Sequence, residues 1–323
     1  MIVFYTFDIP INSNKSNSIL MLNISIYTVL RELGMNVDLI LIYTNNSEEL
    51  KQKLSVNDKR ILFKKIDKRF SNKIQKSKLL YRYDGGFRDE NEHFRIIGNS
   101  FGTAHSRVYL FSRIFKKYKK DILYLDYDTG IAKGCGKNAL SLMLEANIML
   151  EPLTSYNIVN DIMSIYPRLK MDQIPCYVNT YACRWNSGVV YIKCDIKNLK
   201  ILNDIKSYYY RLNRDLGFMQ SADEWSIGLS LFYNNIRPKS TFKDSSFFVP
   251  GSQLYLHTNF NTPSPFVHYM DQKNLENNNI KWLEMLKSWD GFFKSENKEP
   301  EFQMWDYTKR NSNEYVWGRF ETL

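Results

Sequence analysis

Two carboxylates follow directly on an apolar segment near the middle of the chain. The run Leu123-Tyr-Leu-Asp126-Tyr-Asp128 places two aspartates one residue apart after that segment. At the end of a strand the backbone can curve, so both carboxylates can reach one cation. Carboxylate oxygens are the ligands that Mg²⁺ and Mn²⁺ prefer, and such an ion usually takes one or two carboxylates together with substrate phosphates. We therefore expect Asp126 and Asp128 to bind a divalent cation. The alternative is an acidic turn.

The pattern around the aspartate pair predicts a sheet that includes parallel strands. Residues 2–7 and 36–44 are apolar runs of strand length, and residues 15–33 between them carry apolar side chains at helical spacing. A strand, a helix and a strand in this order are typical of a β-α-β unit. Ligands of such sheets bind at the carboxyl ends of the strands. The aspartate pair falls at that edge if residues 121–126 form a strand.

The remainder of the chain alternates between helical and strand patterns, without a repeat or a linker. We expect helices at 104–118, about 138–145, 196–213 and 221–233, and strands at 121–126, about 147–152, 188–193 and 265–270. The polar stretch 83–92 is expected to be a loop, and the aromatic tail 300–323 to pack on the body. One α/β domain with additions is the simplest interpretation.

The Asp126-Tyr-Asp128 run resembles the D-x-D motif of GT-A glycosyltransferases. The order of the other motifs resembles that of family 8, the group of glycogenin and the bacterial galactosyltransferases. The matching positions are Thr6 and Asp8 after the first strand, Arg107 before the D-x-D strand, Asn186 in Asn186-Ser-Gly-Val, Asp223 in Asp223-Glu224, and His268 with Lys273. Arg113 is the reserve for Arg107. The chain departs from the family where Glu224 replaces a Gln, where a Gly before Lys273 is missing, and where Lys273 comes one residue early.

The resemblance, which covers residues 1–275, implies a fold and a reaction. The fold would be GT-A, a Rossmann-like mixed sheet flanked by helices. Residues 1–275 would form the glycosyltransferase domain, and residues 276–323 a helical and aromatic extension packed on it. The reaction would be metal-dependent transfer of a sugar from a nucleoside diphosphate sugar to an acceptor hydroxyl, with retention of the anomeric configuration. The expected donor is a UDP-sugar.

The resemblance also implies roles for individual residues. The cation, Mn²⁺ or Mg²⁺, would be held by Asp126, Asp128 and His268. The nucleotide sugar would be contacted by Thr6, Asp8, Arg107, Asp126 and Lys273, of which Arg107 and Lys273 would add positive charge near the diphosphate. The residues placed at the sugar and the acceptor would be Asp223, Asn186 and Arg107.

The charge of the chain suggests alternatives. The net charge is +10, and the segment 51–78 holds eleven basic residues against two acidic ones, or +9. Because phosphate neutralisation is a main source of nucleic-acid affinity, the acceptor could be a modified base in phage or viral DNA. A metal-dependent nuclease or phosphohydrolase is a further alternative, although that class commonly uses more clustered carboxylates. The last alternative is a protein that binds a sugar nucleotide without catalysing a reaction. The sugar, the acceptor and the oligomeric state stay open.

Cysteine spacing and hydropathy bear on the location of the protein. The four cysteines form no C-x-x-C pair, so we expect reduced thiols and no structural zinc. No apolar run reaches the ~20 residues of a membrane span, and the first residues lack a basic signal-peptide region. We expect a cytoplasmic protein, in the host cytoplasm if it is viral. The richness in Asn, Lys, Ile and Tyr is typical of an AT-rich genome, viral or bacterial.

Overall fold

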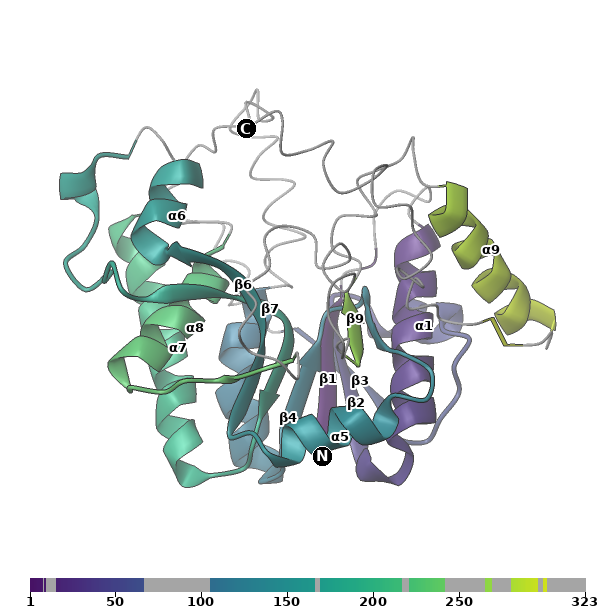
Figure 1. The fold of residues 1–323 in the computed structure, drawn as a ribbon. Helices are drawn as coiled ribbons and strands as arrows, with labels where there is room; N and C mark the ends of the chain where they lie inside the picture. The colour runs from purple at the N-terminus through teal and green to yellow at the C-terminus, as the bar shows by residue number, and fades with distance from the viewer. Residues whose placement is uncertain are drawn as a thin grey trace.

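The fold is a mixed sheet between two layers of helices. The computed structural model describes residues 1–7, 9, 16–66, 105–165, 169–216, 221–241, 265–268, 280–295 and 299–300. The central sheet has seven strands in the order β3-β2-β1-β4-β7-β6-β8, and a two-stranded ribbon, β5-β9, lies beside it (Figure 1). The α/β class with a mixed sheet, expected from the motifs, is confirmed.

The elements of the described residues have the following bounds. The strands of the sheet are β1 (Ile2–Phe7), β2 (Leu39–Thr44), β3 (Ile61–Lys65), β4 (Ile122–Leu125), β6 (Ile148–Asn157), β7 (Cys183–Ile192) and β8 (Lys239–Ser240), and those of the ribbon are β5 (Thr129–Ile131) and β9 (Phe266–His268). The helices are α1 (Ser16–Leu33), α2 (Ser47–Lys53), α5 (Gly136–Leu144), α6 (Ile158–Ile165), α7 (Ile196–Asp215), α8 (Ala222–Tyr233) and α9 (Ile280–Ser295). Residues 105–118 are also helical.

Four neighbouring strands of the sheet, β3-β2-β1-β4, are parallel, β6 and β8 also pair in parallel, and β7 runs against its two neighbours. β1 pairs in parallel with β2 and β4, and β2 pairs in parallel with β3. β7 runs antiparallel to both β4 and β6. The β-α-β pattern therefore predicts the first half of the sheet correctly. The carboxyl ends of β1 and β4 form one edge, and the residues that follow β4 include the aspartate pair.

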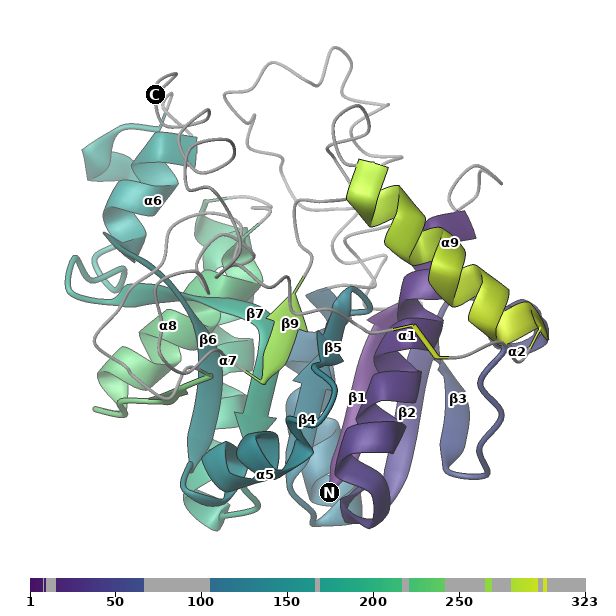
Figure 2. The ribbon, with the colours of Figure 1, turned by 45° about the vertical axis from the view of Figure 1, so that its right-hand side comes forward.

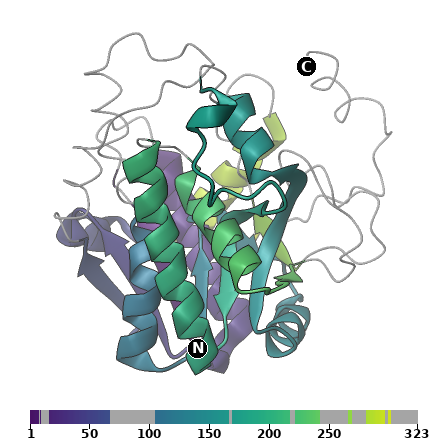
Figure 3. The ribbon, with the colours of Figure 1, turned by 90° about the vertical axis from the view of Figure 1, so that its left-hand side faces the viewer.

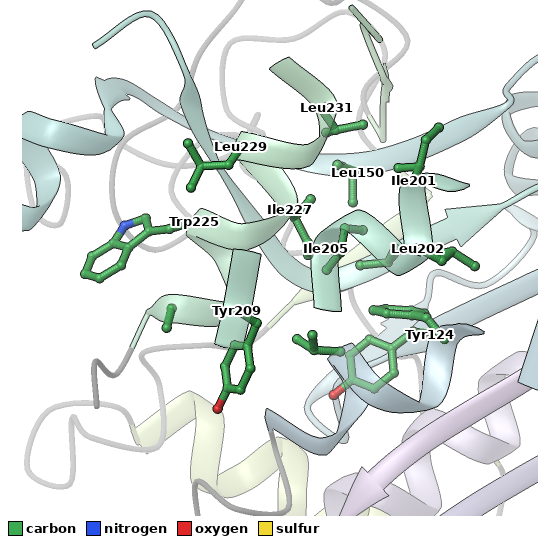
Figure 4. Packing of buried hydrophobic residues seen from close by; sticks show 14 of the residues in the cluster. Tyr124, Leu150, Ile201, Leu202, Ile205, Tyr209, Trp225, Ile227, Leu229 and Leu231 are labelled. Atoms are coloured by element: carbon green, nitrogen blue, oxygen red, sulfur yellow. The ribbon is translucent and has the colours of Figure 1, made fainter. Parts of the chain in front are cut away.

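The alternation of side chains along the strands divides the core in two. Val3 and Leu123 pack with α1 and α5, whereas Phe4 and Tyr124 pack with residues 105–118 and helices α6 to α8. Figure 2 shows α1 and α5 on the near face, and Figure 3 shows α6, α7 and α8 on the other side. Tyr124 lies among the α7 and α8 side chains (Figure 4). Its hydroxyl therefore points towards the same layer as the start of the 105–118 helix.

Several elements differ from the sequence prediction. β7 begins at Cys183, five residues before the expected start at 188, so Asn186 lies within a strand. β6 extends to Asn157, and α6 follows it directly. The sequence also does not predict α2, β3, β5 or β8 as separate elements, and it covers α9 only as part of the expected helical extension 276–323. These elements are short or weakly patterned, so tertiary contacts decide them. The loop at 83–92 and the tail at 300–323 lie mostly or wholly outside the described residues.

Helix α9 packs on α1 through aromatic side chains. Trp289, Phe292 and Phe293 surround Tyr27 of α1, with ring centroids 5.3–5.9 Å from the Tyr27 ring. An ion pair between Arg31 and Glu299 lies beside this cluster, and α9 crosses α1 in Figure 2.

Within the described part of the chain, no helix combines the length and the apolar character that a membrane crossing requires.

We expect that Gly228→Ala destabilises the protein through the contact between α8 and β7. A Cβ at Gly228 would lie 2.0 Å from the Cys183 carbonyl oxygen, which is backbone and cannot rotate away. Helix α8 would have to move off the strand, at a cost of about 1–3 kcal/mol. The matched control is Gly291→Ala in α9, where a Cβ meets nothing within 4 Å. That change should stabilise by about 0.5–1 kcal/mol. If urea unfolding gives the same change in free energy for Gly228→Ala and Gly291→Ala, the close contact between Gly228 and β7 does not limit stability.

Candidate functional site

Arg107 is the centre of a polar cluster at the carboxyl end of β4. Its side chain is buried. Nη1 donates to Asp126 Oδ1 at 2.7 Å and to the Tyr124 hydroxyl at 3.0 Å. Nε donates to Asp223 Oδ2 at 2.8 Å, and Nη2 donates to the same oxygen. The structure thus brings together three residues that the sequence predicts for the site. Arg113, the reserve, is exposed further along the helix.

A chain of hydroxyl groups extends this cluster to β1. The Tyr124 hydroxyl donates to Asp126 Oδ1 at 2.5 Å and lies 3.1 Å from Thr6 Oγ1. Because the single Tyr124 proton goes to Asp126, Thr6 donates to Tyr124. Burial raises the pKa of Tyr124, and the adjacent Arg107 only partly opposes that effect. The phenol therefore stays protonated, as donation to Asp126 requires. Thr6 lies where the sequence predicts it, with its hydroxyl engaged in this chain.

Asp126 and Asp128 offer carboxylates to a cation in different ways. The Asp126 side chain is 26% exposed, and no described residue donates a hydrogen bond to its Oδ2. Asp128 is buried, with 4% exposure. In the ribbon, Thr129 lies directly opposite His268, which brings the backbone of His268 next to Asp128. The imidazole of His268 lies outside the described part of the structure.

This donor set fits a divalent cation. Two carboxylates, one with a free oxygen, match the usual contribution of protein to a Mg²⁺ or Mn²⁺ site. Counting formal charges, Asp126, Asp128 and Asp223 outnumber the single Arg107 by two. A dication held by Asp126 and Asp128 would offset part of the negative charge of these described residues. The described residues contain no group of three metal-ligating side chains, and the side chain of His268, the third ligand expected from the sequence, lies outside them.

Asn186 acts on the backbone beside the aspartate pair. It is buried in β7, and its Oδ1 accepts a hydrogen bond from the Gly188 N–H at 2.6 Å. The Gly188 carbonyl in turn accepts from the Asp126 N–H at 2.8 Å. Asn186 therefore helps to hold the strand segment on which Asp126 rests. Asp8 and Lys273, also predicted for the site, lie outside the described residues.

Asp223 opens α8 and is ionised by its surroundings. Burial alone would raise the pKa of Asp223, but the Arg107 guanidinium and the nearby His105 outweigh burial and lower it. Ser187 Oγ donates to Asp223 Oδ2 at 3.2 Å, and His105 Nε2 lies 3.7 Å from Oδ1. A carboxylate with these partners is a hydrogen-bond acceptor and a source of negative charge, and it is no proton donor at neutral pH.

Three members of the cluster are absent from the sequence prediction, namely His105, Tyr124 and Ser187. Each lies within two residues of a predicted one. Tyr124 precedes Asp126 by two positions, which on a strand places both side chains on one face. The two-residue spacing from Asp126 is therefore the feature of the sequence that could have indicated Tyr124 as a site residue. The partners of His105 and Ser187 are more than thirty residues away, and no local pattern indicates them.

The fold resembles that of a known glycosyltransferase. A crystal structure of the galactosyltransferase LgtC in complex with donor and acceptor sugar analogues superimposes with a TM-score of 0.52 and 14% identity, over 93% of this chain and 98% of that chain. The apo form of mouse xyloside xylosyltransferase 1 is more distant, with a TM-score of 0.42 and 12% identity, over 73% of this chain and 82% of that chain. No protein-family model and no curated protein sequence matches the chain. The likeness to LgtC confirms the GT-A fold that resembles family 8.

The Arg107–Asp223 pair predicts a loss of stability in acid. The pKa of Asp223 lies at about 2, below its ordinary value of 3.8. A carboxylate with a lowered pKa in the folded state stabilises the protein above pH 4 and loses that contribution as the pH falls towards 2. We expect Asp223→Asn to lower the free energy of unfolding at pH 7 by at least about 2 kcal/mol and to weaken its dependence on pH in this range.

The control for this prediction is Asp172→Asn, which changes an exposed carboxylate in the turn 171–173. Chemical unfolding of both variants from pH 7 to pH 2 gives the comparison. An Asp223→Asn protein that follows the wild-type pH dependence would show that Arg107 does not hold this carboxylate ionised.

Proposed function

We propose that the chain is a metal-dependent glycosyltransferase that moves a sugar from a nucleoside diphosphate sugar to an acceptor hydroxyl. One observation carries the proposal. At the carboxyl end of β4, Arg107 joins Asp126 to Asp223, with Asp128 buried beside them. In α/β sheets this edge is the usual place of ligands. The similar fold of LgtC, which was crystallised with donor and acceptor sugar analogues, supports the same use of this edge.

The reaction requires stabilisation of the diphosphate as the bond to the sugar breaks. A Mn²⁺ or Mg²⁺ ion would supply Lewis-acid stabilisation of that charge. Asp126, Asp128 and His268 would hold it. Lys273 is proposed to add positive charge at the diphosphate, and Asp8 to contact the nucleotide, which we expect to be UDP. Thr6 would act indirectly, since its hydroxyl holds Tyr124 against Asp126.

Arg107 would act chiefly on the carboxylates. A guanidinium has five N–H donors. Four of them are used by Asp126, Tyr124 and Asp223. Arg107 therefore orients the Asp126 carboxylate, whose Oδ2 has no donor among the described residues, and holds Asp223 ionised. Among the described residues one N–H of Arg107 has no acceptor, and we propose that it contributes to binding of the diphosphate.

Asp223 is proposed to act on the donor sugar. As an ionised acceptor it would bind sugar hydroxyls, and its negative charge would favour the positive charge that develops at the anomeric carbon. Asn186 would act with it through the backbone next to Asp126. Retention of configuration is part of the proposal and follows from the family 8 resemblance.

The basic segment gives only weak support to a nucleic-acid acceptor. In its described part, residues 51–66, Lys53 pairs with Glu49 and Arg60 pairs with Asp58. Part of the positive charge is therefore neutralised locally. We propose a hydroxyl of a glycan or a protein as the acceptor. Within the described residues no carboxylate cluster suits a two-metal nuclease.

The proposal predicts metal-dependent stabilisation by a nucleotide sugar. A donor that binds only the folded protein stabilises it by mass action. At a free donor concentration of one hundred times Kd the gain is about 2.7 kcal/mol, which raises the unfolding temperature. We expect at least one nucleoside diphosphate sugar to raise it with Mn²⁺ present and to have little effect after chelation with EDTA. Asp128→Asn should abolish the metal-dependent part and lower sugar transfer at least 100-fold.

The control is again Asp172→Asn, which should keep the full shift and the full rate. The assays are thermal unfolding with a panel of nucleotide sugars and chromatographic detection of the released nucleotide. The absence of any metal-dependent shift with every donor would rule out the proposed function. A full response in Asp128→Asn would rule out the metal site alone.

A further inference from the structure

A second ion cluster lies beside the first, with two largely buried carboxylates and an arginine whose side chain is 24% exposed. Arg184 of β7 donates from Nε to Glu224 Oε2 at 2.5 Å, and Nη2 pairs with the same oxygen. Its Nη1 donates to both carboxylate oxygens of Asp161 in α6, at 3.0 and 3.1 Å. The Trp225 indole N–H also donates to Asp161, at 2.5 Å. Arg184 thus connects β7, α6 and α8, and it belongs to none of the sequence motifs.

Arg184 favours the ionised form of Glu224, whose pKa is raised overall because burial outweighs that effect. The Glu224 side chain is 11% exposed and follows Asp223 at the start of α8. Burial raises the pKa of Glu224, Arg184 opposes that effect, and the negative charge of Asp223 adds to it. Arg107, from the 105–118 helix, also favours the ionised form. Among the described residues, the other cation that favours ionised Glu224 is Arg107, which already pairs with Asp126 and Asp223.

Ser187 couples the two ion clusters. Its Oγ lies 3.2 Å from Asp223 Oδ2 and 3.4 Å from Glu224 Oε1, and its backbone N–H donates to the same Glu224 oxygen at 3.4 Å. One hydroxyl proton cannot serve both carboxylates at once. The backbone N–H gives Glu224 its own donor, so the hydroxyl proton is available to Asp223. The position of Glu224 therefore affects how Asp223 is held.

We infer that Arg184 is a positioning residue that holds Glu224 as a second ionised carboxylate beside Asp223. Asp161 holds the other side of Arg184, and Trp225 orients Asp161. The sugar end of the site then carries two fixed carboxylates, each with its own guanidinium. The consequence for catalysis rests on the proposed function, because fixed negative charge at this point would stabilise positive charge on the donor sugar.

The first test is the pH dependence of thermal unfolding in a mutant cycle. The pKa of Glu224 in the folded state is already raised by burial, and Arg184→Met removes the cation that opposes this effect, so that pKa rises further above its unfolded value. Stability is then lost as the pH rises through the folded-state pKa. We expect the unfolding temperature of Arg184→Met to fall by about 5 °C or more at pH 8 and by less at pH 5. Adding Glu224→Gln should remove more than half of this pH dependence.

Two control variants accompany the cycle. Arg184→Lys keeps a positive charge but not the paired geometry, so its pH dependence should stay close to that of the wild type. Lys239→Met breaks an exposed pair with Glu145 and should change neither stability nor its pH dependence. A wild-type pH dependence in Arg184→Met would overturn the inference, as would a double variant that keeps the full pH dependence of Arg184→Met.

The second test uses sugar transfer. Arg184→Met should move the acidic limb of the kcat profile to higher pH, because Glu224 then takes up a proton more readily. Arg184→Lys should lower kcat several-fold without moving that limb. An unmoved acidic limb in Arg184→Met would overturn the link to catalysis. A wild-type protein inactive with every donor would reject the proposed function, and the unfolding cycle would still decide whether Arg184 holds Glu224.

Discussion

The arrangement of the candidate site depends on one buried guanidinium, that of Arg107. It lies between a carboxylate after β4 and a carboxylate at the start of α8, and so joins the central sheet to the helix that packs on it. A buried arginine is tolerated only when its charge is paired and its donors are used. Here two carboxylates and Tyr124 meet that need. The close approach of Gly228 to β7 gives α8 the position from which Asp223 can take part.

A second arginine next to this cluster, Arg184, is also paired with two carboxylates. Arg184 lies between Glu224 and Asp161 much as Arg107 lies between Asp126 and Asp223, and Ser187 touches both clusters. Among the described residues, two carboxylates share one guanidinium in each cluster, so the formal charge of these side chains is negative. Such negative charge at the end of a sheet favours a bound cation and a substrate that becomes positive as it reacts. The electrostatics of the described residues therefore point in the same direction as the fold.

The sequence predicted the fold where contacts are local and strongly patterned. The alternation of apolar residues in β1 and β2 and the helical spacing of α1 are local patterns, and they gave a β-α-β unit close to the observed one. The ribbon of β5 and β9 was only half predicted. Each of its strands has three residues, and their pairing joins positions more than 130 residues apart. The early start of β7 escaped prediction because its first residues are polar, and pairing with β6 decides their conformation.

The sequence by itself determined which groups are available and on which edge of the sheet they lie. Asp126 and Asp128 follow a strand, and Asp223 opens a helix, for reasons of local pattern and spacing. Only the tertiary structure decided which arginine pairs with which carboxylate. Arg107 and Asp223 are 116 residues apart, and Arg184 and Glu224 are 40 apart. Charge pairing between such residues follows from how helices pack on the sheet, and no local spacing encodes it.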